Sequence, residues 1–163
     1  MRYHLSRKAI GIGLDCDGTR EDAAPGIPME SPIKVLLVDD EQPFVESLAK
    51  VLRRRGMAVR TTYDGESALS AASGGEFDVI VLDLTMPGMD GVATLQGLRQ
   101  RDRLTPVLLL TAHAEVERAT QALREGAADF LLKPCPVDEL VAALEDARER
   151  KASARDVAPA DEP

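Results

Sequence analysis

Apolar residues occur along the chain in short unbroken runs, and longer stretches with apolar residues at helical spacing separate these runs. Residues 35–38 and 79–82 consist only of Val, Leu and Ile. Continuous apolar runs of this kind are typical of parallel strands that are buried on both faces. Together with similar segments elsewhere in the chain, they predict five strands. The predicted strands cover residues 35–38, 58–62, 78–82, 106–110 and 129–132.

Each predicted strand is followed by a predicted helix. Phe44, Leu48 and Leu52 recur at helical spacing after the first strand, and Gly56 ends this helix. Five strands that alternate with helices predict an α/β fold, in which a doubly wound parallel sheet has right-handed crossovers and helices on both faces. Ligands bind such sheets beyond the C-terminal ends of the strands. The other helices are expected around residues 66–72, 92–98, 115–125 and 136–144.

The chain of 163 residues is long enough for one domain with a buried core and two tails. We place the domain at residues 32–150. Residues 1–31 lack clean periodicity and hold several prolines, which favours an irregular or disordered extension. Residues 151–163 are expected to form a disordered tail. Met29 is an alternative translation start, in which case residues 1–28 would not belong to the protein.

Charge and composition exclude several classes of function. The net charge of −8 and the pI near 4.8 argue against direct binding of nucleic acid. Two cysteines are too few for a disulfide framework, which fits a reduced, cytoplasmic setting. No run approaches the roughly 20 apolar residues of a transmembrane helix. Asp15 and Asp17 interrupt the apolar stretch near the N-terminus, so neither a signal peptide nor a membrane partner is expected.

Three acidic residues follow the two most apolar strands: Asp39 and Asp40 come after the first, and Asp83 after the third. A carboxylate at the edge of a buried sheet must be paired, protonated or bound to a metal. If the two strands are parallel neighbours, the three acids meet at one edge and can bind a hard divalent cation such as Mg²⁺. Thr111 and Lys133 follow two further strands and belong to the same edge.

Four motifs carry a resemblance to a known family. They are Val-Asp-Asp-Glu at 38–41, Leu-Asp-Leu-Thr-Met-Pro-Gly-Met-Asp-Gly at 82–91, Leu-Thr-Ala at 110–112 and Ala-Asp-Phe-Leu-Leu-Lys-Pro at 128–134. Their order and spacing resemble bacterial response-regulator receiver domains, over about residues 33–150. The resemblance implies a flavodoxin-like sheet with strand order 2-1-3-4-5.

The resemblance also implies a phosphoacceptor site. Asp83 would accept a phosphoryl group from a histidine kinase or a histidine phosphotransfer protein. Asp39, Asp40, Asp83 and the main-chain carbonyl of Thr85 would bind Mg²⁺, which neutralises the charge of the transferred group. Crowding among the three carboxylates would lower stability without metal, so Asp39→Asn is expected to raise the melting temperature in the absence of Mg²⁺.

The remaining motif residues have implied roles in the switch. Lys133 and Thr111 would contact phosphoryl oxygens, and Phe130 would move from a more exposed to a more buried rotamer. The peptide bond between Lys133 and Pro134 would be cis, so that the lysine points at Asp83. We expect a stand-alone signalling switch rather than an enzyme, with only Mg²⁺-dependent self-phosphorylation and slow autodephosphorylation. Its partners would be the kinase, an unknown downstream protein and, after phosphorylation, a second copy of the chain.

Three alternatives compete with this interpretation. The segment Asp15-Cys16-Asp17-Gly18-Thr19 resembles the nucleophile loop of haloacid-dehalogenase-type phosphatases, but the match is short. A flavodoxin-type electron carrier needs a phosphate-cradling loop after the first strand, where this chain has the acids 39–41. A receiver-like docking module that is not phosphorylated is the main alternative. We disfavour it because Asp39, Asp40, Asp83, Thr111 and Lys133 are all present.

Overall fold

The computed structural model describes residues 31–86, 88 and 90–157. The expected extension up to residue 30, the alternative start at Met29 and the phosphatase-like motif at 15–19 lie outside the described residues. Residues 158–163 of the expected tail lie outside them as well.

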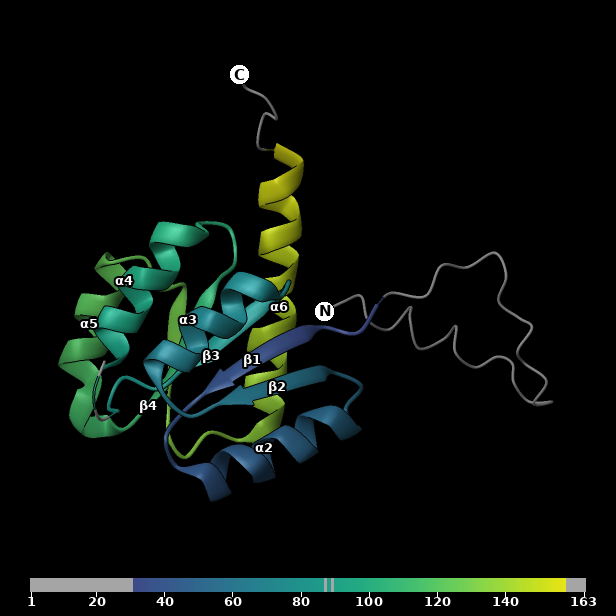
Figure 1. Ribbon diagram of the computed structural model, residues 1–163. Coiled ribbons are helices and arrows are strands. Elements are labelled where there is room, and N and C mark those ends of the chain that lie inside the picture. The colour runs from purple at the N-terminus through teal and green to yellow at the C-terminus, as the bar shows by residue number, and fades with distance from the viewer. Residues whose placement is uncertain (1–30, 87, 89, 158–163) are drawn as a thin grey trace, which may run out of the picture. The chain divides into compact units, whose positions relative to one another are not determined.

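The described strands form one parallel sheet in the order β2-β1-β3-β4-β5 (Figure 1). This order confirms the flavodoxin-like prediction. The chain winds in one direction from β1 to β2 and in the other from β3 to β5. The winding therefore reverses between β1 and β3, which is where doubly wound folds bind their ligands. The strands are β1 (Lys34–Val38), β2 (Ala58–Thr62), β3 (Val79–Leu82), β4 (Val107–Thr111) and β5 (Asp129–Leu132).

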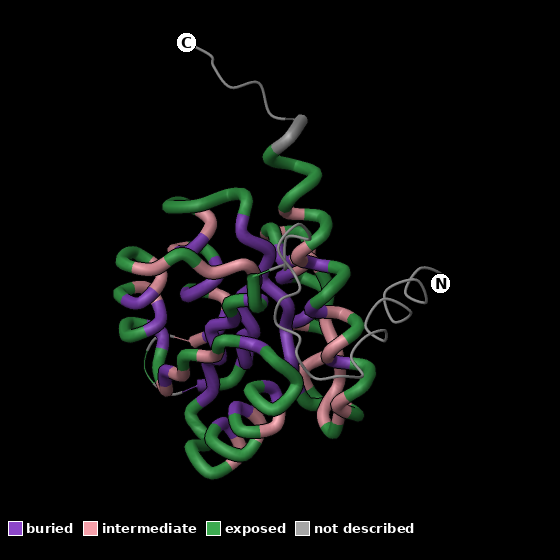
Figure 2. The backbone as a smooth tube through the Cα atoms, turned by 90° about the vertical axis from the view of Figure 1, so that its right-hand side faces the viewer, coloured by how far each residue is buried: buried purple, intermediate pink, exposed green. Residues whose placement is uncertain are grey.

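The helices cover both faces of the sheet, as the sequence predicts. One apolar cluster joins α2 and α6 to one face, and a second joins α3, α4 and α5 to the other. The buried segments of Figure 2 lie in the strands and on the inner sides of these helices. The helices are α2 (Gln42–Arg54), α3 (Gly65–Gly74), α4 (Gly91–Arg101), α5 (Val116–Arg124) and α6 (Val137–Val157), and a short 3₁₀ turn, η2, covers His113–Glu115.

The start of α4 is fixed by two features next to the phosphoacceptor position. The carboxylate of Asp90 caps the helix by accepting a hydrogen bond from the backbone N–H of Ala93 at 3.0 Å. Gly91 then packs directly on the backbone behind Asp83, since a Cβ at this position would lie 2.5 Å from the Asp83 carbonyl oxygen. A glycine here lets α4 begin close to the end of β3.

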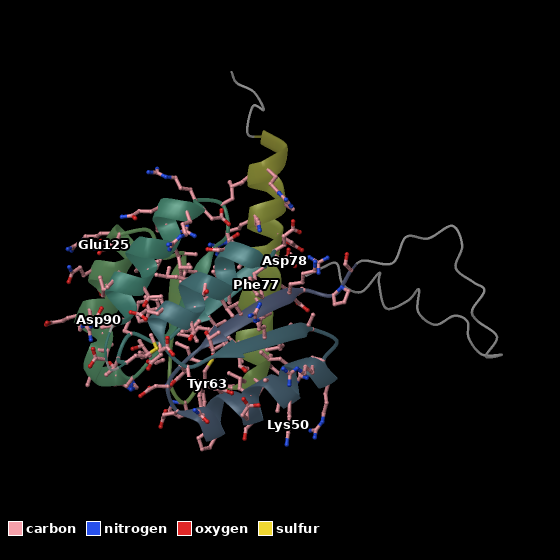
Figure 3. The ribbon with its side chains drawn as sticks, in the orientation of Figure 1. Lys50, Tyr63, Phe77, Asp78, Asp90 and Glu125 are labelled. Atoms are coloured by element: carbon pink, nitrogen blue, oxygen red, sulfur yellow. The ribbon has the colours of Figure 1, made fainter. Side chains whose placement is uncertain are left out.

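The last helix differs from the sequence prediction. A disordered tail was expected from residue 151, but α6 continues through Val157. Lys151 Nζ donates hydrogen bonds to the Phe77 carbonyl oxygen at 2.7 Å and to Thr105 Oγ1 at 2.9 Å. Phe77 precedes β3 (Figure 3) and Thr105 precedes β4, so the lysine ties the helix to the N-terminal edge of the sheet.

Candidate functional site

The acidic residues meet at the C-terminal edge of the sheet, as predicted. Parallel pairing sets Val38 of β1 opposite Leu82 of β3, so the residues that follow them are neighbours. The Asp83 N–H donates to the Val38 carbonyl oxygen at 2.9 Å, which continues this pairing. One carboxylate oxygen from each of Asp39, Asp40 and Asp83 lies within 4.8 Å of the others. Asp39 and Asp83 are buried, whereas Asp40 is exposed.

Lys133 enters the same site from the end of β5. Its N–H donates to the Thr111 carbonyl oxygen at 2.7 Å, and its peptide bond to Pro134 is cis, as predicted. The Lys133 ammonium lies 2.7 Å from Asp39 Oδ2 and 3.9 Å from Asp83 Oδ1. The lysine therefore reaches the acidic cluster, but its closest partner is Asp39 rather than Asp83.

Burial and the neighbouring carboxylates change the acidity of Asp83. Burial raises the pKa of the Asp83 carboxyl from 3.8 to about 6, and the Asp39 carboxylate adds to this rise. Lys133 and a hydrogen bond from the Thr85 N–H act in the opposite direction, and Asp40 raises the pKa further. Burial is the largest cause of this rise, and the two neighbouring carboxylates also disfavour the ionised form of Asp83.

Electrostatics also hold Lys133 in its charged form. Burial alone would lower the pKa of the Lys133 ammonium. The hydrogen bond to Asp39 and the attraction of Asp83, Asp39 and Glu41 outweigh burial, so the pKa of Lys133 is raised. A permanent positive charge therefore stands beside Asp83.

Thr111 brings an unpartnered hydroxyl to the site. The residue ends β4 and is completely buried. Its Oγ1 has no hydrogen-bond partner among the described residues. Buried hydroxyls normally have a partner, so this group is available to a ligand that reaches the sheet edge.

Two of the predicted residues lie at the margin of the site. Thr85 follows Asp83 by two positions, and its N–H donates to the Asp83 carboxylate while its side chain is exposed. Phe130 lies in the edge strand β5 and is half-buried against the cluster formed with α3, α4 and α5. The structure holds one orientation of this ring, so the predicted rotamer change stays a prediction.

Lys133 also contacts two side chains, Glu41 and Phe44, that were not assigned to the site from the sequence. Glu41 Oε1 lies 3.5 Å from Lys133 Nζ, and the Phe44 ring centroid lies 4.7 Å from it. Glu41 immediately precedes α2, and Phe44 lies in the first turn of this helix. Helical spacing identified Phe44 only as a core residue. The feature that could have indicated a role in the site is the position of Phe44 in the first turn of a helix that begins at this edge of the sheet.

An ion pair connects the start of α4 with α5. Arg118 of α5 contacts Asp90, the cap of α4, at 3.0 Å and Glu115 at 2.9 Å. Figure 3 shows Asp90 on the side of the sheet that carries α4 and α5. Asp90 therefore caps α4 and also pairs with Arg118 of α5.

The residues of the site fit a divalent cation. Three carboxylates with oxygens within 4.8 Å supply the hard donors that Mg²⁺ prefers. Asp39 and Asp40 both raise the pKa of Asp83, so the carboxylates repel one another even with Lys133 beside them. An additional positive charge would therefore stabilise the arrangement.

Comparison with known proteins identifies the family. A sequence model of the response regulator receiver domain matches residues 35–145. This chain belongs to the response regulator receiver family. It is 41% identical to the transcriptional regulatory protein TcrA of Mycobacterium tuberculosis over 114 residues, which are 70% of this chain and 45% of TcrA. It is 40% identical to PrrA of the same organism over 120 residues, which are 74% of this chain and 52% of PrrA.

Solved receiver structures share the fold. A response regulator receiver domain protein from Clostridium thermocellum has a TM-score of 0.72 and 28% identity, and the match covers 74% of this chain and 98% of that one. The receiver domain is the signalling switch of two-component systems and interacts with histidine kinases. The present receiver spans about half the length of the curated relatives named above. Among the described residues, no helix has the length and apolar character needed to span a bilayer.

Proposed function

We propose that this receiver accepts a phosphoryl group on Asp83 and uses it to switch a protein-contact face. The observation that supports this most strongly is the meeting of a buried Asp83 with two further carboxylates, Lys133 and the unpartnered Thr111 hydroxyl. These groups come from the ends of four strands, β1, β3, β4 and β5. A solvated helix acid or a structural ion pair would not require such a convergence.

The proposed reaction is a phosphoryl transfer from a phosphohistidine. An Asp83 carboxylate oxygen bonds to phosphorus, the phosphorus–nitrogen bond breaks, and the electron pair remains on the imidazole of the donor. With a pKa of about 6, Asp83 is mainly ionised at neutral pH and can act as the nucleophile. Lys133 and the Thr111 hydroxyl would donate hydrogen bonds to the phosphoryl oxygens of the resulting acyl phosphate.

Asp39, Asp40, Asp83 and the Thr85 carbonyl would hold the cation. Mg²⁺ bound there neutralises charge on the transferring group. The chain's own contribution is to hold the acids on adjacent strands and to keep Asp83 buried. Because Asp39 and Asp83 are buried, only a small phosphodonor, or a histidine that projects into the site, would reach Asp83.

The output is proposed to run through the loop after β4. Thr111 would draw this loop toward the phosphoryl group, and Phe130 would follow into the space that the loop leaves. The contact face would consist of α5, β5 and α6, and its partner would be a downstream protein or a second phosphorylated copy.

We place the protein in the cytoplasm. The expectation that residues 32–150 do not bind nucleic acid themselves stays a prediction, because the relatives named above are transcriptional regulators that extend beyond the matched region.

Incubation with acetyl phosphate and Mg²⁺, followed by intact mass spectrometry, tests the proposal. The wild-type chain should gain the mass of one phosphoryl group, and the gain should require Mg²⁺. Asp83→Asn should gain none. Asp146→Asn, which removes an exposed acid of α6 paired only with Arg150 among the described contacts, should behave like wild type. A wild-type chain that takes no phosphoryl group from acetyl phosphate or from a kinase would favour the docking-module alternative.

A further inference from the structure

Phe44 occupies a distinctive position between the hydrophobic core and the charged site. It lies in the first turn of α2, and its half-buried ring packs against the core cluster under α2 and α6. The ring centroid is 4.7 Å from Lys133 Nζ. Phe44 also lines a small pocket, together with Asp39 and Asp83. Phe44 therefore touches the ammonium group from the apolar side of the site.

Lys133 has to change partners during the proposed reaction. Its ammonium is closest to Asp39 at 2.7 Å, with Glu41 at 3.5 Å and Asp83 at 3.9 Å. Asp39 is also a proposed ligand of the cation. A cation on Asp39 would compete with the lysine for the carboxylate oxygens, and the lysine would then turn to the phosphoryl oxygens on Asp83. The exposed Glu41 offers a competing carboxylate in the direction of solvent.

An aromatic ring suits a lysine that changes partners. The face of a phenyl ring attracts an ammonium group without accepting a directed hydrogen bond and without exchanging a proton. The lysine can therefore keep this contact while its carboxylate partner changes. An aliphatic side chain of similar size would fill the core equally well, but it would offer the ammonium no electrostatic attraction.

We propose that Phe44 is a positioning residue for phosphoryl transfer, because its ring keeps the Lys133 ammonium beside Asp83 while the lysine moves from Asp39 to the phosphoryl group. This inference rests on the proposed function of Asp83. It adds a residue of α2 to the site and assigns its action to Lys133. Phe44 itself does not contact the reacting oxygens.

Three variants separate the ring face from simple packing. Phe44→Leu keeps an apolar side chain at the site, and Phe44→Tyr keeps the ring. Leu48→Val perturbs the same pocket one turn further along α2, without a residue that contacts Lys133. With acetyl phosphate and Mg²⁺, we expect F44L to take up phosphate about three- to tenfold more slowly than wild type. F44Y and L48V should keep rates close to wild type.

A double-mutant cycle tests whether Phe44 acts through Lys133. In the K133A background, F44L should cause no further slowing, because the group that the ring positions is gone. Equal slowing in both backgrounds, or no effect of F44L on the wild-type rate, would overturn the inference. If K133A takes up phosphate too slowly to measure, the same two substitutions are compared, singly and together, by their effects on the free energy of unfolding. Additive effects of F44L and K133A on this free energy would also overturn the inference. A wild-type chain that accepts no phosphoryl group would instead contradict the proposed function.

Discussion

Lys133 Nζ is 2.7 Å from Asp39 Oδ2 and 3.9 Å from Asp83 Oδ1. The lysine thus pairs most closely with a proposed metal ligand, while the proposed phosphoacceptor has a raised pKa. Cation binding at Asp39 would release the lysine toward Asp83. Metal binding would in this way be linked to the placement of the positive charge beside Asp83.

Asp83→Asn should stabilise the metal-free protein, and the gain should depend on pH. The folded-state pKa is raised from 3.8 to about 6, so the folded protein binds more protons than the unfolded chain between these values. The unfolding free energy that Asp83 contributes therefore falls as pH rises through this window. The difference between D83N and wild type should grow from near zero at about pH 3 to about 3 kcal/mol at about pH 7. Urea denaturation without Mg²⁺ at a series of pH values measures it, and a difference that does not change with pH would contradict the account.

The structure refines the prediction for Asp39→Asn. From the sequence, this variant is expected to melt at a higher temperature without Mg²⁺, because it relieves crowding among the carboxylates. It also removes the ion pair with Lys133 at 2.7 Å, which offsets the gain. We therefore predict that D39N stabilises the metal-free protein less than D83N does. Melting temperatures of both variants in EDTA check this order, and the reverse order would show that Asp39 is the more strained acid.

Thr111→Val should leave the stability of the unphosphorylated protein unchanged or raise it by up to about 1 kcal/mol. The reason is that the buried hydroxyl has no partner among the described residues, so its removal breaks no hydrogen bond. The phosphorylated protein should differ, because the proposed hydrogen bond to the phosphoryl group is lost. Amide exchange in residues 112–116 should then respond less to phosphorylation than in wild type. A loss of stability well above 1 kcal/mol before phosphorylation would mean that the hydroxyl is already bonded.

Gly91→Ala should destabilise the protein by about 1–3 kcal/mol, because the added Cβ would clash with the backbone of Asp83 and Leu84. The clash can be relieved only if α4 moves away from β3, so phosphate uptake should fall as well. Gly74→Ala is the matched control, since a Cβ there meets nothing within 4 Å and the backbone is not in a left-handed conformation. Thermal unfolding and acetyl phosphate labelling of both variants check the prediction, and equal effects of the two would count against close packing at Gly91.

Much of the site follows from sequence because strand ends in a parallel sheet share an edge. The apolar runs before Asp39 and Asp83 locate two buried strands, and the pairing of those strands brings the acids together. Strand boundaries at 58–62 and 129–132 agree with the prediction. These features depend on local sequence patterns and on a general topology rule for parallel sheets, so a single sequence is enough to predict them.

Other features depend on contacts between distant residues. Lys133 pairs most closely with Asp39 because of side-chain geometry across β1 and β5, two strands that are not adjacent in the sheet. The extension of α6 through Val157 depends on Lys151, which binds groups that lie 74 and 46 positions away in the chain. Phe44 shows the same limit, since its helical spacing indicates burial but not which cation its ring faces.

The central claim is that Asp83 carries the phosphoryl group. Borohydride reduces an aspartyl phosphate to the alcohol, which converts the modified residue to homoserine, and peptide mass spectrometry then locates it. After treatment with acetyl phosphate and Mg²⁺, we predict homoserine at position 83 and unmodified aspartate at positions 39 and 40. Homoserine at position 39 or 40, or at no position in a chain that has gained phosphate, would contradict the account.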